Sequence, residues 1–405
     1  MVSKIRRKQP IRGSLLERRR EQNPPAFYHS ARALPRSPEP PGLALKLQVP
    51  LRDILGETPL TGRTDMTNSL PLSPTAARPP EPEVSVVIPT YNRAELLPAL
   101  IDALLAQQRH AIAYEILIVD NASTDGTAAT VAARAHPVIR YLYEPRPGAS
   151  NARNAGIQHA AGALIAFIDD DLLPAADWLQ TITATMRANP EADCVGGRIE
   201  PKWPRTPPPW LTPANYAPLA LQYGRGSGKP LSASNASGCL VSANFICRRD
   251  VLRDVGGFSP AFVRDEDREF NLRLWRAGKI GIYADAIVAT AVVQSERLTK
   301  AYHRRWHAVT GANHARMRLK EIIAADGHLT EPVTRHRLFG TPAYVYRELG
   351  GELINYVLAL VARRAPETFT AECRVRYLVS YMWTRALEDV KGPPSLGPHS
   401  AQAPS

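Results

Sequence analysis

The strongest constraint on the fold is a regular alternation of short apolar runs and helical stretches between Val84 and Leu172. The apolar runs VSVVIP, EILIVD, IRYLYE and ALIAFI have the length of strands. The segments between them are predicted as helices at residues 92–107, 127–135 and 151–160. Strands and helices joined by short links predict an α/β fold, with a mostly parallel, Rossmann-like sheet and helices on both faces.

The first of these helices carries a start signal. Asn92 can cap the helix, and Glu95, three residues later, completes a capping box. We therefore expect the helix to begin at this point, directly after the first strand.

Polar clusters follow all four predicted strands. Ligands of parallel α/β sheets bind beyond the carboxyl ends of the strands, so we expect the clusters to meet at one edge. Carboxylates suit a ribose, a base or a metal ion, and guanidinium and backbone amide groups suit phosphate. Together the clusters favour a nucleotide site over four unrelated solvated turns. They comprise residues 90–93, 120–125, 146–153 and 169–171.

The fourth strand ends in three consecutive carboxylates, Asp169, Asp170 and Asp171. Adjacent anions repel one another, and a bound cation or hydrogen bonds from a ligand would relieve that repulsion. Hard divalent ions favour carboxylate oxygens. A solvated turn with a helix cap is the alternative, and this segment alone leaves both interpretations open.

The two ends of the chain differ in composition from its middle. Fourteen of the 37 prolines lie in residues 1–83, and residues 4–36 hold eight of the twelve net positive charges. We predict a disordered basic arm (1–83), a folded α/β domain (84–300), a helical C-terminal extension (301–391) and a disordered tail (392–405). Loose contact of the arm with anionic membrane or nucleic acid, and a merely solvated tail, both remain open.

Two features bear on the cellular location. No window approaches the roughly 18–20 apolar residues that span a bilayer, and the N-terminal stretch lacks the apolar core of a secretory signal. The four cysteines form no CxxC pair and have no histidine at zinc-ligand spacing, which indicates reduced thiols. We expect a cytoplasmic protein, either soluble or peripheral at the inner face of the membrane. The cysteines are Cys194, Cys239, Cys247 and Cys373.

An amphipathic stretch runs from Tyr344 to Arg364. Its apolar side can rest on lipid while Arg363 and Arg364 meet anionic headgroups, or it can pack against the folded domain. The sequence leaves both possibilities open.

Six motifs occur in a fixed order and spacing: VSVVIPTYNR, EILIVDNASTDGT, RPGASNARNAGI, AFIDDD, NFICRRDVLRDVGGF and EDREFNLRLWRAG. As a set they resemble the family 2 glycosyltransferases, which are inverting enzymes of the GT-A fold. The resemblance covers about residues 84–300. The segment VGGRIEPKWPRTPPPWL, followed by SANF, is similar to a bacterial branch associated with surface polysaccharides and other glycoconjugates.

The resemblance implies a nucleotide-sugar site. Asp120 would hydrogen-bond the base, and Arg153, with Asn151 nearby, would face the diphosphate. The residues implied to line the base and ribose are Pro89, Thr90, Tyr91 and Arg93.

The three aspartates correspond to the DxD element of the family. Asp169 would contact the ribose, with Asp170 beside it in the nucleotide-sugar site, and Asp171 would bind a divalent cation, Mn²⁺ or Mg²⁺. Such an ion can neutralise the leaving nucleoside diphosphate. Relatives often place a histidine shortly before the stretch ERLT, but ATAVVQS has none, and His303 and His307 lie further on.

The catalytic base implied by the resemblance is Asp267, with Glu266 beside it. A carboxylate at this position would take the proton of the attacking hydroxyl. Acidic residues also stabilise helix N-termini, so capping of the predicted helix is the alternative role for these two residues and Asp265.

The expected function is inverting transfer of a sugar from a nucleotide donor, a UDP-sugar, to a hydroxyl of a glycan or lipid-linked acceptor in polysaccharide or glycoconjugate synthesis. The alternatives are a sugar-nucleotide nucleotidyltransferase and a nucleic-acid-binding protein. A nucleotidyltransferase would want a glycine-rich loop after the first strand, and PTYNRAE has none. The α/β domain shows no basic face or stacking platform, so we expect no specific nucleic-acid partner.

Overall fold

The computed structural model describes residues 82–107, 112–223, 230–332 and 336–391. The predicted basic arm and C-terminal tail lie outside these residues.

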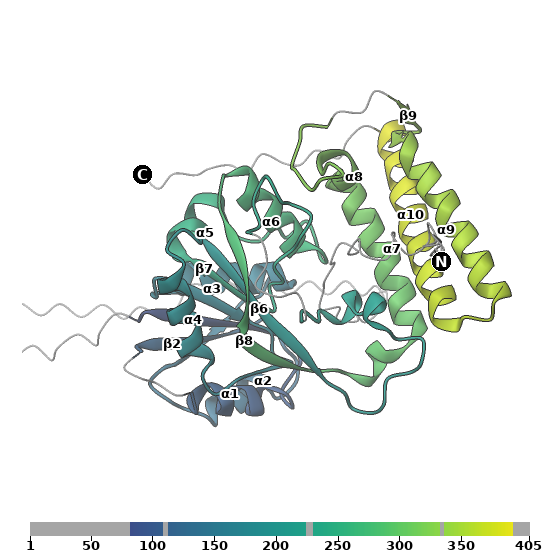
Figure 1. Cartoon of the computed structure of the whole chain (residues 1–405). Coiled ribbons are helices and arrows are strands. Elements are labelled where there is room, and N and C mark those ends of the chain that lie inside the picture. Colours follow the sequence, from purple (N-terminus) through teal and green to yellow (C-terminus); the bar gives the residue numbers. More distant parts are fainter. Residues whose placement is uncertain (1–81, 108–111, 224–229, 333–335, 392–405) are drawn as a thin grey trace, which may run out of the picture. The chain divides into compact units, whose positions relative to one another are not determined.

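An eight-stranded sheet with the order β3-β2-β1-β4-β7-β6-β8-β5 forms the centre of the described chain (Figure 1). The pairs β3-β2, β2-β1, β1-β4 and β6-β8 are parallel, and the pairs of β7 with its neighbours and of β8 with β5 are antiparallel. The predicted mostly parallel α/β sheet is therefore confirmed. The strands are β1 (Val84–Thr90), β2 (Tyr114–Asp120), β3 (Ile139–Tyr143), β4 (Leu164–Ile168), β5 (Leu172–Pro174), β6 (Cys194–Lys202), β7 (Asn244–Arg248) and β8 (Gly281–Val292).

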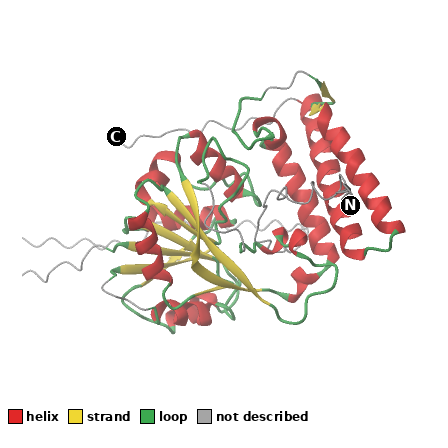
Figure 2. Ribbon diagram, viewed as in Figure 1, coloured by secondary structure: helices red, strands yellow, loops and turns green. Residues whose placement is uncertain are grey.

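Helices cover both faces of this sheet (Figure 2). Successive side chains of a strand point to opposite faces, so Val86 and Ile88 pack with α1 and α4, whereas Val87 packs with α3 and α6. Each face of the sheet thus has its own apolar core, and β1 is buried on both faces. The helices are α1 (Leu97–Leu105), α2 (Thr127–Ala132), α3 (Ala149–His159), α4 (Trp178–Ala188), α5 (Arg249–Val255) and α6 (Glu266–Arg276).

The predicted capping box at the first helix is wrong. Helix α1 begins at Leu97, after Leu96, and no side chain caps it. Asn92 instead adopts a positive φ of 50°, and its Oδ1 accepts a hydrogen bond from the backbone N–H of Thr124 at 2.8 Å. Asn92 therefore joins the loop after β1 to the loop after β2, a tertiary role that competes with local capping.

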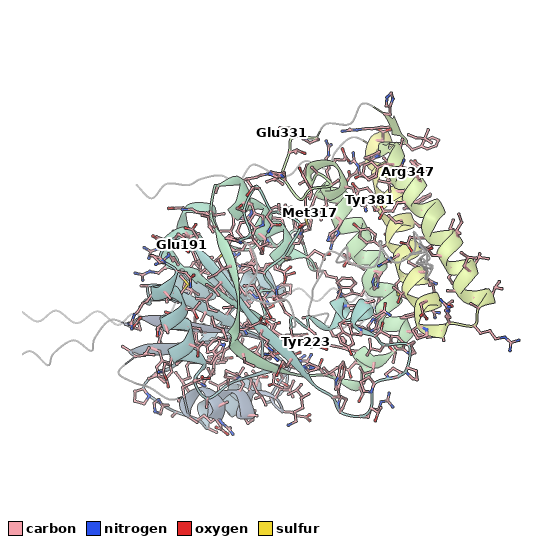
Figure 3. The ribbon with its side chains drawn as sticks, in the orientation of Figure 1. Glu191, Tyr223, Met317, Glu331, Arg347 and Tyr381 are labelled. Atoms are coloured by element: carbon pink, nitrogen blue, oxygen red, sulfur yellow. The ribbon has the colours of Figure 1, made fainter. Side chains whose placement is uncertain are left out.

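A group of C-terminal helices follows the sheet. Helix α10 lies between α7 and α9, and these helices share a small core of Ala315, Val345, Leu378 and Tyr381 (Figure 1; Tyr381 is labelled in Figure 3). The elements are η3 (Ser295–Leu298), α7 (Lys300–Arg316), α8 (Leu319–Ile322), a hairpin of β9 (Arg337–Leu338) and β10 (Thr341–Pro342), α9 (Ala343–Val361) and α10 (Ala365–Lys391).

Two further expectations from the sequence concern the cysteines and the ability of a helix to cross a membrane. All four cysteines are buried and form no disulfide, as expected for reduced thiols. Among the described helices, none combines the length and the apolar character needed to cross a membrane.

Candidate functional site

The polar clusters predicted to meet at one edge of the sheet do so. Thr90, the last residue of β1, lies opposite Asp120, the last residue of β2, and Asp120 lies opposite Tyr143 at the end of β3. Strand β4 runs parallel to β1 on the other side, so Asp169 to Asp171 follow at the same edge. Residues far apart in sequence are thereby gathered because parallel strands end together.

Asp120, the predicted base-binding residue, is buried and already oriented. Its Oδ1 accepts from the backbone N–H of Ser123 at 2.9 Å, and its Oδ2 accepts from the hydroxyl of Tyr141 at 2.6 Å. Burial and the bond to Asp120 raise the pKa of Tyr141 well above its usual value, so the phenol stays protonated and donating. Sequence reasoning missed Tyr141, although the alternation of side chains along β3 could have indicated the side of the sheet on which Tyr141 lies.

The loop after β1 contains the residues predicted to line base and ribose. Pro89 and Thr90 are buried, while Tyr91 and Arg93 are half-buried. The Thr90 hydroxyl is fully buried, and no described residue hydrogen-bonds to it. Since an unsatisfied buried hydroxyl is unfavourable, a polar ligand atom at this position would stabilise it.

The loop before α3 is held by Asn121, another residue that sequence reasoning missed. Its Nδ2 donates to the carbonyls of Glu144 and Arg146, and its Oδ1 accepts from the N–H of Gly148 at 2.6 Å. Gly148 has a φ of 119°, which only glycine adopts readily. Asn151, predicted near the diphosphate, lies in the first turn of α3 and donates to the carbonyl of Pro147.

Arg153 of α3 joins two groups of carboxylates. Its guanidinium donates to Asp169 Oδ1 at 2.8 Å and to Glu266 Oε1 at 2.9 Å, and its side chain is 1% exposed. Burial lowers the pKa of Arg153, but Asp169 and Glu266 outweigh burial and raise it, so the arginine stays charged. In this structure Arg153 is thus a bridge between the end of β4 and the start of α6. Asp169, Asp170, Asp171, Glu266 and Asp267 together are called the carboxylate site below.

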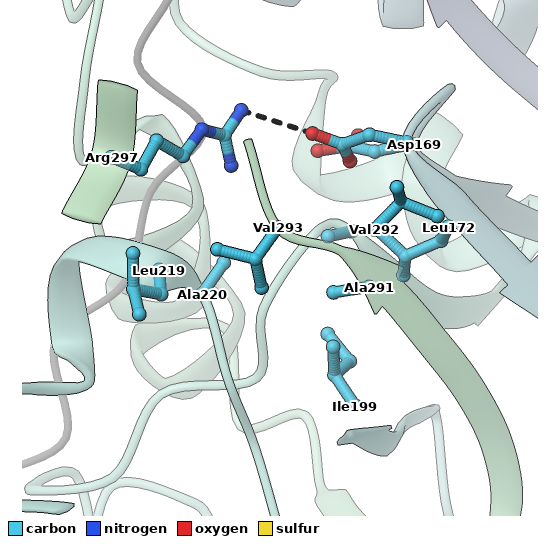
Figure 4. Close-up of a pocket in the computed structure, with 11 residues that line it drawn as sticks. Asp169, Leu172, Ile199, Leu219, Ala220, Ala291, Val292, Val293 and Arg297 are labelled. Atoms are coloured by element: carbon cyan, nitrogen blue, oxygen red, sulfur yellow. Dashed lines mark hydrogen bonds and ion pairs between the residues drawn. The ribbon is translucent and has the colours of Figure 1, made fainter. Parts of the chain in front are cut away.

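A second arginine, Arg297 of η3, contacts the carboxylate site from the other side. It donates to Asp171 Oδ2 at 2.9 Å, and Gln294 Nε2 donates to the same oxygen at 3.0 Å. Arg297 and Asp171 line a small cavity together with apolar side chains such as Leu172 and Leu219, and Figure 4 labels Arg297 and these two leucines. Sequence reasoning gave neither Gln294 nor Arg297 a role, although both lie in the segment where it noted that a histidine is absent.

The residues present do not fit a metal centre built by the protein. Asp169 is paired with Arg153, and Asp171 is paired with Arg297. Within the described parts of the chain, no three side chains of the usual metal-ligating types are placed so that together they could hold a metal ion. A divalent cation at Asp171 would meet a carboxylate whose charge a guanidinium already balances.

The two histidines that follow the ERLT stretch, His303 and His307, lie on α7, and His303 is next to the backbone of Arg297. His303 Nε2 is 3.1 Å from the carbonyl oxygen of Arg297, and His307 Nδ1 is 2.8 Å from the carbonyl oxygen of His303. Burial, together with His307, lowers the pKa of His303 to about 3, and burial lowers the pKa of His307 to about 4. Both rings are therefore neutral near pH 7, and His303 contacts the backbone of the Arg297 segment.

The three acidic residues at the start of α6 have different partners. Asp265 adopts a positive φ of 66° and accepts hydrogen bonds from Thr310 and Asn313 of α7, at 3.3 and 3.0 Å. Glu266 accepts from Arg153. Asp267, the predicted base, accepts from the backbone N–H groups of Arg268 and Ser242, at 2.7 and 3.4 Å. Asp265 precedes α6 and makes no side-chain cap to it, while Glu266 and Asp267 lie in its first turn, where acidic residues are favourable.

Comparison with known proteins gave matches over the same region. The family model described as Glycosyl transferase family 2 matches residues 85–256. Glycosyltransferase AglE of Haloferax volcanii is 31% identical over 211 residues, which are 51% of this chain and 66% of that protein. Glucosyl-dolichyl phosphate glucuronosyltransferase of the same organism is 28% identical over 188 residues, 46% of this chain and 59% of that protein. This chain thus spans between 59% and 66% of the length of these two relatives.

Among solved structures, the mannosyltransferase PcManGT from Pyrobaculum calidifontis, in complex with GDP-Man and Mn²⁺, matches with a TM-score of 0.50. The match covers 77% of this chain and 88% of that chain at 21% sequence identity. At this identity the likeness concerns the fold alone, and it confirms the predicted GT-A architecture.

Proposed function

We propose that this chain, which belongs to glycosyl transferase family 2 through residues 85–256, transfers a sugar from a nucleotide-sugar donor to an acceptor hydroxyl. The observation that carries the proposal is the position of Arg153, which joins Asp169 at the end of β4 to Glu266 at the start of α6. That bridge brings the residues assigned to the donor and those assigned to the acceptor into one site.

The donor half of the site lies at the ends of β1, β2 and β4. We assign base recognition to Asp120, which Tyr141 and Ser123 already orient. The unpartnered Thr90 hydroxyl supports a ligand contact beside it, with Pro89, Tyr91 and Arg93 along the same loop. Asp169 and Asp170 would face the ribose, and Asn151 would lie toward the diphosphate.

The acceptor half centres on Asp267. In an inverting displacement the acceptor oxygen forms a bond to the anomeric carbon while the bond from that carbon to the diphosphate oxygen breaks. The nucleoside diphosphate leaves with the electron pair, and the acceptor proton passes to Asp267. Two backbone N–H groups hold the carboxylate of Asp267 in place, whereas Glu266 is engaged with Arg153. These contacts favour Asp267 as the base and Glu266 as the residue that positions Arg153.

For the substrates, we propose a UDP-sugar donor and a lipid-linked or glycan acceptor in polysaccharide or glycoconjugate synthesis. A lipid-linked acceptor is supported by the glucosyl-dolichyl phosphate glucuronosyltransferase among the relatives, whose name describes such a substrate. No described feature favours the nucleotidyltransferase or nucleic-acid alternatives.

A lipid-linked acceptor agrees with an exposed apolar surface on α9. Only Val345 and Ala359 of this helix are buried, while apolar side chains on its other sides face solvent, among them Val361 at 78% exposure. Packing against the folded domain therefore does not explain the amphipathic pattern along the whole helix, because most of these apolar side chains are exposed. The exposed residues, called the outer face of α9 below, are Leu353, Ile354, Val357, Leu358, Leu360 and Val361.

We propose that the outer face of α9 rests on an anionic membrane at the cytoplasmic side. Arg347 flanks it at one end, and Arg363 and Arg364 flank it at the other, and all three are exposed (Arg347 is labelled in Figure 3). Apolar contact combined with flanking cations is the pattern of interfacial helices. The buried, unbridged cysteines agree with a reducing compartment.

A donor screen tests the proposed function. The purified full-length chain is incubated with UDP-, GDP- and dTDP-sugars, and release of the nucleoside diphosphate and thermal stabilisation are measured. We expect release and stabilisation with one nucleotide class, UDP first. Stabilisation by none of the three would contradict the assignment of the donor site.

A further inference from the structure

We infer that Arg297 acts as a built-in counter-cation for Asp171, so that this protein binds the diphosphate of its donor without a divalent metal ion. The inference rests on the proposed function, because it concerns how the proposed donor is held. It assigns a role to two residues, Arg297 and Gln294, that the sequence motifs left without one.

The chain fixes Arg297 at Asp171 through several independent contacts. At the end of β8, the N–H of Val292 donates to the backbone carbonyl of Asp171 at 2.8 Å, which aligns the end of this strand with the aspartate. Gln294 then reaches Asp171 Oδ2, and one turn of η3 brings Arg297 to the same oxygen. The ion pair is therefore a consequence of strand register and does not depend on the rotamer of an exposed side chain.

Neighbouring elements support the Arg297 segment from behind. His303 of α7 contacts the carbonyl of Arg297, and Thr299 caps α7 by accepting from the N–H of Tyr302. Because His303 is neutral near pH 7, Arg297 brings the positive charge on this side of Asp171. The guanidinium is nearly fully buried, so the pair is poorly screened by solvent.

Two arginines pair with three of the five acidic residues in the carboxylate site, namely Asp169, Glu266 and Asp171. Arg153 pairs with Asp169, and Arg297 pairs with Asp171, while Asp170 also acts on Arg297 electrostatically. A divalent cation at Asp171 Oδ2 would compete with the charge-assisted hydrogen bond from Arg297. The observed pairing thus replaces the cation that the DxD pattern predicts.

A guanidinium can also supply what a metal ion would supply to the donor. It carries five N–H donors in a planar fork that matches phosphate oxygens, and its contact with Asp171 uses Nη2. Charge-assisted hydrogen bonds from the remaining donors can stabilise the negative charge that develops on the leaving diphosphate. Asp171 would then hold Arg297 in position and would not act as a metal ligand.

The test measures nucleotide binding, not turnover. UDP and GDP are each titrated into the full-length protein by calorimetry, once in EDTA and once in Mn²⁺. We expect dissociation constants that agree within about threefold between the two conditions, because the diphosphate contacts come from arginine. For Arg297→Gln we expect binding in EDTA to weaken by about tenfold or more and to recover in part with Mn²⁺, because Asp171 is released for the ion.

The control variant is Arg374→Gln, which removes a half-exposed ion pair with Glu352 far along the helices and should leave both titrations unchanged. Binding by the unmodified protein that requires Mn²⁺ would overturn the inference while leaving the proposed function intact. Absence of UDP and GDP binding under both conditions, together with no binding of dTDP, would overturn the proposed function itself. The comparison in the unmodified protein decides the inference even if Arg297→Gln does not fold.

Discussion

The carboxylate site buries charged side chains, whereas the outer face of α9 exposes apolar side chains. In the carboxylate site five acidic side chains are almost fully buried, and two buried arginines, Arg153 and Arg297, form ion pairs with three of them. On the outer face of α9, apolar side chains that could have been buried are exposed. Burial of charge and exposure of apolar surface are both unfavourable in isolation. In the carboxylate site ion pairs within the chain offset the first, whereas no described part of the chain covers the exposed side chains of α9.

Because the two regions differ, we expect substitutions in the carboxylate site to lower catalysis or stability, and substitutions on the outer face of α9 to weaken vesicle binding. The largest effect is expected at Asp267. Asp267→Asn should lower the rate of sugar transfer by about 10² to 10⁴, the scale of losing a general base, while nucleotide affinity stays nearly unchanged. A transfer assay paired with calorimetric titration measures both. Transfer at the parent rate would return Asp267 to a purely structural role.

The second prediction concerns the bridge inside the carboxylate site. Arg153→Gln removes one cation from two buried carboxylates, Asp169 and Glu266, so we expect the free energy of unfolding to fall by about 3–5 kcal/mol. Chemical denaturation followed by circular dichroism measures this loss. As a control, Arg304→Gln breaks a partly exposed pair with Glu372 and should cost about 0–1 kcal/mol. Equal losses in the two variants would remove the distinction between the buried bridge and an ordinary surface pair.

The third prediction concerns vesicle binding by the outer face of α9. The double substitution Val357→Glu and Val361→Glu should weaken binding to phosphatidylglycerol vesicles by about tenfold or more, because apolar contact is replaced by repulsion from anionic lipid. Thermal stability should hardly change, since both side chains are exposed.

Co-sedimentation measures the vesicle binding, with Val263→Glu as a control because Val263 is equally exposed but lies before α6. A dimer in solution that the double substitution dissociates, without any vesicle binding, would assign the outer face of α9 to self-association instead.

The smallest effect is expected for His303, which lies behind Arg297. Its pKa is lowered to about 3 by burial and by His307, so between pH 3 and about 6.5 the unfolded chain binds a proton that the folded chain does not. Stability from this residue is therefore present above the unfolded pKa and is lost as the pH falls below it. His303→Gln should abolish a loss of about 1–2 kcal/mol between pH 7 and pH 5, measured by denaturation at each pH. Identical pH profiles of parent and variant would show that His303 is not buried in its neutral form.

The sequence predicted those parts of the structure that local patterns determine. The four parallel strands β1 to β4 have short apolar runs, and their polar ends gather because parallel strands share an edge. The amphipathic pattern of α9 likewise predicted a helix. A local pattern does not show, however, which side of that helix a neighbouring helix covers. The prediction of a capping box was wrong for the same reason, because Asn92 accepts a hydrogen bond from a residue in another loop.

The pair of Arg297 with Asp171 lay beyond sequence reasoning because it joins residues 126 positions apart. It depends on the register of β8 with β5 and β6, and on antiparallel pairs that a strand-helix alternation does not predict. Arg153 was recognised as a site residue, but its double pairing with Asp169 and Glu266 required the placement of α6.

The hydrogen bonds between Asp265 and α7 have a mechanical consequence. Asp265 immediately precedes Glu266 and Asp267, and its carboxylate is held by Thr310 and Asn313 of a helix whose other side packs on α10. A continuous set of contacts therefore runs from the proposed base through α7 and α10 to α9. Under the proposal that the outer face of α9 rests on a membrane, these contacts would set the orientation in which Asp267 faces an acceptor in that membrane.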